Sequence, residues 1–171
     1  MSDIQIEEIG IGVDPSYILV EATIASMDTD NCWYVACPLT FEDRKCKKKL
    51  TLIEDGIWKC QRCNQCGFEC EYRYIFQFTI EDNTGKADAT TFQDVAEQII
   101  DIPSFKLSEY GYEGNTKETT TIFSKFFFNR YLFKLEVHEE TFANQKHIKN
   151  IVIACDKMDS MKNPKIKHTH P

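Results

Sequence analysis

The stretch Cys37–Cys63, CPLTFEDRKCKKKLTLIEDGIWKCQRC, decides the fold around it. Its cysteines are Cys37, Cys46, Cys60 and Cys63, separated by eight, thirteen and two residues. A Cys-x-x-Cys step lets two thiolates bind one zinc ion from a tight turn, and a distant pair of cysteines completes a tetrahedral shell. The spacing therefore predicts one zinc ion bound by these four residues.

The residues between the cysteines predict a β-hairpin. Two short β-prone runs, 49–53 and 57–59, flank the turn Glu54-Asp55-Gly56. This is the hairpin of a zinc ribbon. Four thiolates on a divalent ion leave about two net negative charges. Seven nearby cations can offset them: Arg44, Lys45, Lys47, Lys48, Lys49, Lys59 and Arg62.

The choice of ligands has rivals, because Cys66 and Cys70 continue the cysteine series and Cys32 precedes it. Replacement of Cys63 by Cys66 or Cys70 is the main alternative. In either case a site with four protein ligands leaves no open position for a substrate, so its expected role is structural.

Composition bounds the function classes. The chain has 171 residues, 42% of them hydrophobic, which is enough for one domain with an insertion. The formal charge of −7 and pI near 5.1 argue against coating duplex DNA by bulk charge. We find no signal peptide and no apolar run long enough to span a membrane, so no membrane partner is expected. Clustered thiols in such a chain favour metal binding and an intracellular, cytoplasmic or nuclear, location.

The order of the expected elements predicts an all-β fold with short helices. We expect residues 1–16 to form a leader, 17–158 an OB-fold domain with a ribbon insertion at about 32–70, and 159–171 a polar tail. Within the domain, strands are expected at 17–25, 72–80, 87–91, 131–137 and 148–154, with a helix at 92–102 ended by Pro103. A long loop with some helix is expected at 104–121, and a short helix at 122–128. Five strands with a helix between the third and fourth make the five-stranded OB-fold barrel.

Particular residues resemble a known family. The runs Asn31–Pro38, Cys46–Lys49, Gly56–Cys63, Tyr72–Tyr74 and Thr91–Gln93 are similar to the C-terminal zinc-containing OB domain of the replication protein A large subunit. The resemblance extends from about residue 17 to 159. It implies a zinc ribbon between the first two strands, single-stranded DNA binding in DNA replication, a nuclear location and assembly with two smaller OB-fold subunits.

The resemblance also assigns roles to residues. Cys37, Cys46, Cys60 and Cys63 match the family's zinc ligands, and Phe142 matches a stacking aromatic in the loop between the last two strands. Asn83 stands where a second stacking aromatic would be. The long helix used for trimer assembly is not evident after Asp156. A ciliate telomerase-associated paralogue, a processivity subunit, is a further candidate, which would imply a telomerase complex as partner, G-rich telomeric DNA as ligand and a role in telomere maintenance.

An enzyme is not expected. Zinc deaminases need a His-x-Glu element followed by Pro-Cys-x-x-Cys, but His138-Glu139-Glu140 follows the cysteines, and Lys59 precedes Cys60 where proline is required. No phosphate-binding glycine loop or nucleophile elbow is present in the sequence.

Two non-catalytic functions therefore remain. A single-stranded DNA binder needs a basic, aromatic outer face. We expect Arg73 and Lys134 on the outward faces of neighbouring strands to supply it, and the bounding loops add Phe142, Lys86, Lys146 and Lys149. The alternative is a protein-interaction module that tethers a larger complex, which the acidic charge and the aromatic run at Phe126 and Phe127 favour.

Overall fold

Residues 14–158 are described by the computed structural model, and the order of their barrel strands follows the sequence-based prediction. In chain order the strands are β1 (Ser16–Met27), β2 (Trp33–Ala36), β3 (Thr40–Phe41), β4 (Arg44–Lys45), β5 (Thr51–Glu54), β6 (Ile57–Cys60), β7 (Gln65–Gly67), β8 (Glu71–Glu81), β9 (Lys86–Phe92), β10 (Arg130–Phe142) and β11 (Gln145–Lys157). The helices α1 (Gln93–Ile100), α2 (Ser104–Tyr112) and α3 (Thr116–Ser124) lie between β9 and β10.

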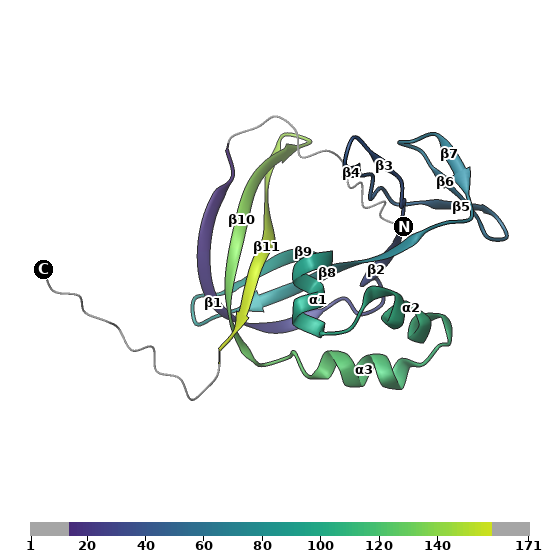
Figure 1. Ribbon diagram of the computed structural model, residues 1–171. Helices are drawn as coiled ribbons and strands as arrows, with labels where there is room; N and C mark the ends of the chain where they lie inside the picture. The colour runs from purple at the N-terminus through teal and green to yellow at the C-terminus, as the bar shows by residue number, and fades with distance from the viewer. Residues whose placement is uncertain (1–13, 159–171) are drawn as a thin grey trace, which may run out of the picture.

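Strand β1 closes the sheet into a ring. The sheet order is β1-β10-β11-β9-β8-β2, and β1 pairs with β8 as well as with β10 (Figure 1). The change of partner occurs at Thr23, which lies opposite Arg130 of β10 and Glu81 of β8. A parallel bridge between Thr90 and Ile151 joins β9 to β11. The predicted OB-fold barrel, formed by β1, β8, β9, β10 and β11, is confirmed.

Burial alternates along most of β8 and β10, although Ile75 on the outward face of β8 is buried as well. On β8, Tyr74, Phe76, Phe78 and Ile80 are all buried, and on β10 so are Tyr131, Phe133 and Leu135. Successive residues of a strand point to opposite faces, so these aromatic and aliphatic side chains fill the barrel interior. Two buried polar groups are satisfied there: the Tyr74 hydroxyl donates to the Ile102 carbonyl oxygen at 2.8 Å, and Thr91 Oγ1 donates to the Val152 carbonyl oxygen at 3.0 Å.

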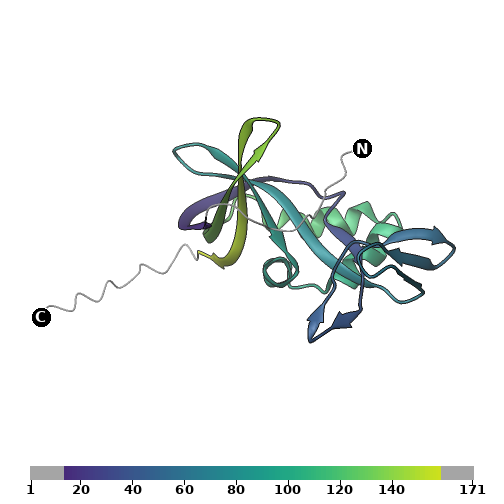
Figure 2. The same cartoon turned by 90° about the horizontal axis from the view of Figure 1, so that it is seen from above.

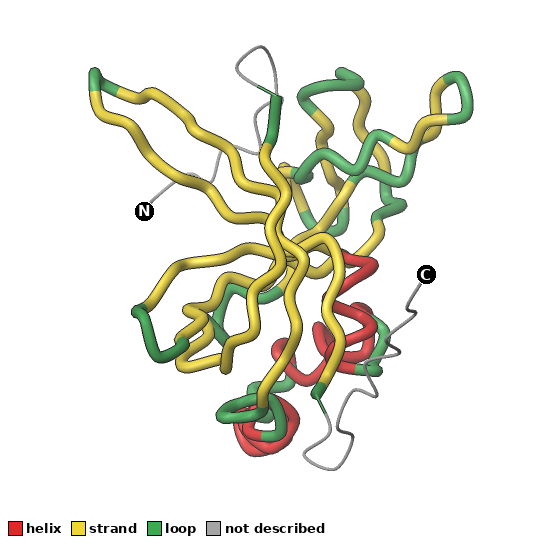
Figure 3. Tube along the Cα trace, turned by 90° about the vertical axis from the view of Figure 1, so that its left-hand side faces the viewer, coloured by secondary structure: helices red, strands yellow, loops and turns green. Residues whose placement is uncertain are grey.

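The ribbon is inserted between β1 and β8 and forms a separate lobe (Figure 3). The predicted hairpin is present as β5 and β6, and its turn needs Gly56, whose φ of +76° is strained for other residues. A third strand, β7, pairs with β6 and places Cys66 opposite Lys59, which sequence patterning did not predict. Strand β2 pairs with the beginning of β8 and so anchors the lobe to the barrel.

An aromatic contact joins the ribbon, the barrel and a helix. The ring centroids of Trp33 and Tyr72 are 5.6 Å apart, and Tyr112 of α2 lies 5.1 Å from Trp33 and 6.2 Å from Tyr72. Trp33 also packs against both hydrophobic clusters of the domain, the barrel core and the smaller core around the ribbon cysteines. This contact therefore fixes the lobe relative to the barrel.

The helical region differs from its prediction. The helix expected at 92–102 is α1, which ends at Ile100 with Asp101 in the left-handed conformation. The long loop with some helix expected at 104–121 is instead mostly helical, as α2 and most of α3, and the short helix expected at 122–128 is present only as the end of α3 at Ser124. Only a few residues of each helix, such as Leu107 and Phe123, are buried. The helical spacing of apolar residues is therefore weak in the sequence and hard to recognise. Phe126 and Phe127 follow α3 half-buried against the core, so they are not the exposed aromatics that were expected.

The last hairpin is longer than predicted. Strands were expected at 131–137 and 148–154, but β10 and β11 pair out to Phe142 and Gln145. The connecting residues Ala143 and Asn144 have φ values of +50° and +61°, as a two-residue type I′ turn requires. Strand β1 pairs with β10 only as far as Val137, so the outer half of the hairpin projects beyond the sheet.

The chain ends lie mostly outside the described residues. The polar tail predicted at 159–171 and all but the last part of the leader predicted at 1–16 fall there. Within the described residues, β1 begins at Ser16 and β11 ends at Lys157.

We expect Phe133→Ala to lower the free energy of unfolding by about 3–5 kcal/mol, because it leaves a cavity at a fully buried ring. The matched control is Leu132→Ala, the next residue on the opposite face, which is 36% exposed and should cost much less. Urea denaturation measures both. Equal losses would contradict the assigned alternation of β10.

Candidate metal centre and nucleic-acid interface

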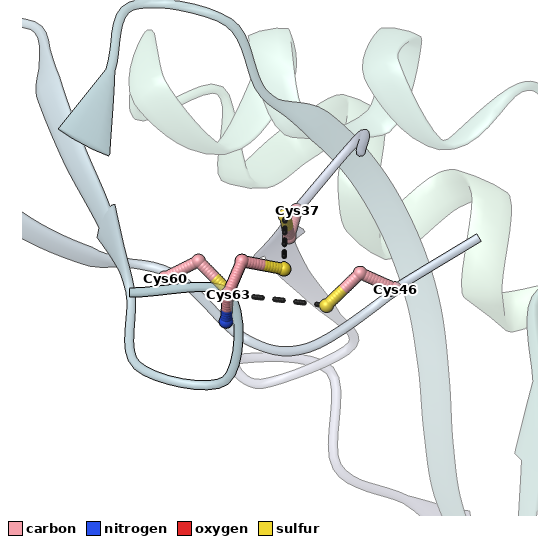
Figure 4. A group of neighbouring side chains, drawn as sticks. All are labelled: Cys37, Cys46, Cys60 and Cys63. Atoms are coloured by element: carbon pink, nitrogen blue, oxygen red, sulfur yellow. Dashed lines mark hydrogen bonds between the residues drawn. The ribbon is translucent and has the colours of Figure 1, made fainter. Parts of the chain in front are cut away.

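The four predicted cysteines come together at one point of the ribbon (Figure 4). Their sulfur atoms all lie within 4.8 Å of one another. Cys37 Sγ lies 3.9 Å from Cys63 Sγ, and Cys46 Sγ lies 3.7 Å from Cys60 Sγ. Metal–sulfur bonds of about 2.3 Å in a tetrahedron place sulfur atoms about 3.8 Å apart. The arrangement therefore fits one tetrahedral thiolate-bound ion.

Local backbone geometry brings the sulfurs together. The amide of Cys37 donates to Lys48 O and that of Cys46 to Leu39 O, which folds the segment between the first two cysteines into a closed loop. The Cys63 amide donates to Cys60 Sγ at 3.4 Å. Lys47 and Asn64, each one residue after a cysteine, have φ of +56° and +52°. Each Cys pair thus sits on a tight turn that presents sulfur toward the centre.

The remaining cysteines lie elsewhere. Cys66 is exposed on β7, and Cys70 packs at the edge of the ribbon core without entering the four-sulfur group. Cys32 is buried in the barrel core, where its thiol donates to Thr29 O and burial raises its pKa to about 12. Cys155 is likewise held neutral, since burial raises its pKa to about 12. The structure thus gives the rivals Cys66 and Cys70 no place in the cluster.

The electrostatics of the cluster favour a bound cation. Burial raises the pKa of Cys37 and of Cys63. Burial opposes ionisation of Cys60 too, but the Cys63 amide and the neighbouring thiols stabilise its thiolate and lower its pKa overall. One thiolate at Cys60 then disfavours further negative charge beside it. A divalent cation at the centre removes that penalty, because it stabilises all four thiolates together.

The expected stacking residue is well exposed. Phe142 is the last residue of β10, 77% exposed, at the tip of the projecting hairpin. Figure 2 shows this hairpin and the β8–β9 hairpin as two loops projecting from the barrel. Asn83 lies in the second of these, where Asp82 accepts hydrogen bonds from the amides of Thr84 and Gly85. One hairpin tip therefore offers a ring, and the other a polar turn.

The lysines expected in the bounding loops are all in ion pairs. Lys146 contacts Glu139, Lys149 lies 3.8 Å from Glu140, and Lys86 lies 3.4 Å from Glu81. These partners are exposed, and exposed pairs are worth only about 0–1 kcal/mol, so a phosphate can displace them. The glutamates nevertheless cancel the local positive charge, which patterning along the chain could not reveal because partners lie on opposite strands.

Arg73 and Lys134 were expected on neighbouring strands, and this expectation is wrong. Arg73 lies on β8 and Lys134 on β10, strands that are not paired with each other. The Arg73 side chain is only 14% exposed and lies 4.0 Å from a Glu71 oxygen. The Lys134 ammonium lies 5.8 Å from the Tyr17 ring centroid. Strand pairing therefore does not place the two cations side by side.

Tyr34 is a neighbour of Arg73 that sequence reasoning missed. It lies opposite Arg73 across β2 and β8, and its hydroxyl donates to Lys47 O at 3.3 Å. Burial raises its pKa, although the Arg73 guanidinium partly offsets this. No strand was predicted at 33–36, and only the pairing register places Tyr34 beside Arg73 and connects the barrel to the lysine-rich loop of the ribbon.

Comparisons with known proteins agree with this geometry. The family model described as "Replication factor-A C terminal domain" matches residues 17–166. Replication protein A 70 kDa DNA-binding subunits C and A of Arabidopsis thaliana are 36% and 39% identical over 95% and 91% of the chain. Replication factor A protein 1 of Saccharomyces cerevisiae is 29% identical over 86%. The chain spans 19–25% of the length of these relatives.

Solved structures show the same fold. A structure of yeast RPA bound to ssDNA superposes with a TM-score of 0.71 at 28% identity, covering 92% of this chain and 85% of that one. A replication protein A heterotrimer bound to ssDNA superposes with a TM-score of 0.73 at 24% identity, covering 86% of this chain and 33% of that one.

No helix within residues 14–158 is long and apolar enough to cross a membrane.

We expect the four clustered thiols to bind one divalent ion tetrahedrally. Co²⁺ added to the reduced, metal-stripped chain should give thiolate charge-transfer and tetrahedral d–d absorption at one equivalent. Cys60→Ser should abolish this spectrum. Cys66→Ser, the matched control outside the group, should keep it. An unchanged spectrum in Cys60→Ser would show that the ligand set is wrong.

Proposed function

Since the chain belongs to the replication factor-A C-terminal domain family, we propose that it is a non-catalytic single-stranded DNA-binding domain of a replication protein A-like large subunit. The observation that carries the proposal is the Phe142 ring, exposed at the tip of the hairpin between the last two barrel strands. In an OB-fold this loop borders the strand-binding face. An exposed ring there can stack on any unpaired base, whatever the sequence.

The charge distribution makes stacking the main expected source of affinity. The net charge is −7, and Lys86, Lys146 and Lys149 are matched by glutamates. Phosphate attraction therefore depends on a few cations, of which we propose Arg73 and Lys134 in addition to the three lysines. Binding should release few counterions, which corresponds to a salt slope of about two to four phosphate contacts.

The bound metal is proposed to be zinc. Four thiolates in tetrahedral geometry suit a d¹⁰ ion without other geometric preference, and the closed shell supports a structural role. Cys37, Cys46, Cys60 and Cys63 would hold it. We expect elemental analysis of the chain purified without added metal to find one zinc per chain. Iron in its place, or no metal in folded protein, would refute this assignment.

Biological context follows from the family as a further proposal. We propose a nuclear role in DNA replication and assembly with smaller OB-fold subunits. A telomere role, with a telomerase complex as partner and G-rich strands as ligand, is the more specialised version. The alternative function is a protein-interaction module with little DNA binding of its own. Phe128 favours this alternative, because its ring is 83% exposed at a residue with φ of +64°.

Phe142→Ala should weaken binding of a labelled single strand by about 1–3 kcal/mol, or roughly 5- to 150-fold, nearly equally at low and high salt. Stacking releases no counterions, which explains the weak salt dependence. Phe128→Ala removes an equally exposed ring outside the hairpin and should bind as the wild type does. Fluorescence anisotropy at two salt concentrations measures both.

Two further comparisons complete the test. Lys134→Ala should weaken binding and flatten the salt slope, since it removes a phosphate contact. A G-rich telomeric strand and a mixed-sequence strand separate the telomeric from the general role. If Phe142→Ala and Lys134→Ala both bind DNA like the wild type, the proposed face is wrong and the interaction module becomes the better account.

A further inference from the structure

The first half of β1 is a sheet edge. Residues 16–22 pair with β10 on one side, and β8 begins to pair on the other side only at Thr23. Within residues 14–158, no strand pairs with the second edge of 16–22, and Figure 1 shows this part of β1 at the margin of the barrel. Such an edge presents a row of backbone N–H and C=O groups that can pair with another strand.

Both faces of this edge expose large apolar side chains. Tyr17 and Leu19 on the outer face are 58% and 69% exposed. Ile18 lies on the inner face and is 45% exposed, although Leu135, its partner across β10, is only 2% exposed. The difference arises because Leu135 has a strand on each side and Ile18 has one. The end of the barrel is therefore incompletely covered along this edge.

The usual protections of an edge strand are missing from residues 16–20. Edges are commonly blunted by lysine, proline or a bulge within the strand. Tyr17–Val20 contains none of these, and the irregularity in β1 occurs later, between Ile24 and Ser26. The nearest charge in the strand, Glu21, is bound to Arg130. Residues 16–20 thus have no charged side chain and no bulge that would oppose the addition of a strand.

We propose that the Ser16–Ala22 edge accepts an extended segment of a partner protein as an additional β-strand. A helix would cover one face and leave the backbone groups unpaired, whereas a strand in the plane of the sheet covers Ile18 and Leu19 together and completes the hydrogen bonds. The Lys134 ammonium lies over the Tyr17 ring. The matching segment therefore has apolar residues on both faces and an acidic residue on the outer face, near Lys134.

The test uses the whole chain and a synthetic eight-residue peptide rich in valine with one glutamate. Its control is the same peptide N-methylated at alternate backbone nitrogens, which cannot form the ladder. We expect saturable binding of the first peptide, at least tenfold weaker binding of the second, and new hydrogen-exchange protection at alternate amides of residues 16–22. Leu19→Lys should reduce binding at least tenfold, and Leu52→Lys, at a comparably exposed leucine of the ribbon, should not.

Other occupants of the edge give distinct results. A concentration-dependent dimer in sedimentation that Leu19→Lys dissolves would assign the edge to a second copy and overturn the proposal. Protection of the same amides in the peptide-free chain, lost on deleting residues 1–13, would assign it to the chain's own beginning and also overturn it. No binding at millimolar peptide would do the same. Phe142→Ala, at the hairpin tip beyond the part of β10 that pairs with β1, should weaken DNA binding and leave peptide binding unchanged, so failure here is separable from failure of the proposed function.

Discussion

The structure depends on one strand that serves two sides of the barrel. At Thr23, β1 leaves β10 and joins β8, and the Thr23 hydroxyl secures the transfer by donating to the Glu81 carbonyl oxygen at 3.2 Å. Without this change of partner, the sheet would stay open between β1 and β8. The interior rings on β8 and β10 would then lose their cover. The same geometry leaves the first half of β1 with an unpaired edge, so closure of the barrel and exposure of Leu19 have a common cause.

The ribbon is attached to this barrel by the pairing of β2 with β8 and by the packing of Trp33. Its own core consists of Val35, Cys37, Leu50 and Cys60, two of which are proposed metal ligands. So small a core cannot supply much stability by burial alone, and small lobes of this kind are usually completed by a metal. The contacts among the Trp33, Tyr72 and Tyr112 rings couple the position of the lobe to that of the barrel. Binding of the proposed metal would thereby be linked to the positions of Tyr34 on β2 and Arg73 on β8, the neighbours in sequence of Trp33 and Tyr72.

The surface charges explain how an acidic chain can serve the proposed role. Glutamates form ion pairs with Lys86, Lys146 and Lys149 of the two hairpins, so the hairpins carry little net positive charge. In the proposed function, affinity for a single strand would then rest on the exposed Phe142 ring, whose interaction with bases is insensitive to salt. Weak electrostatic attraction is suited to a domain that acts beside other DNA-binding domains, because tethering raises the effective concentration of each.

The sequence alone determined the barrel strands, the β5–β6 hairpin and the presence of a four-cysteine site in the ribbon. These follow from local rules, namely side-chain alternation, turn residues and thiol spacing, which act over a few residues. The exclusion of Cys66 and Cys70 from the cluster, the ion pairs of Lys146 and Lys149 and the separation of Arg73 from Lys134 were decided only by the tertiary structure. Each depends on strand register, which brings together residues far apart in the chain, and no local pattern specifies which strands become neighbours.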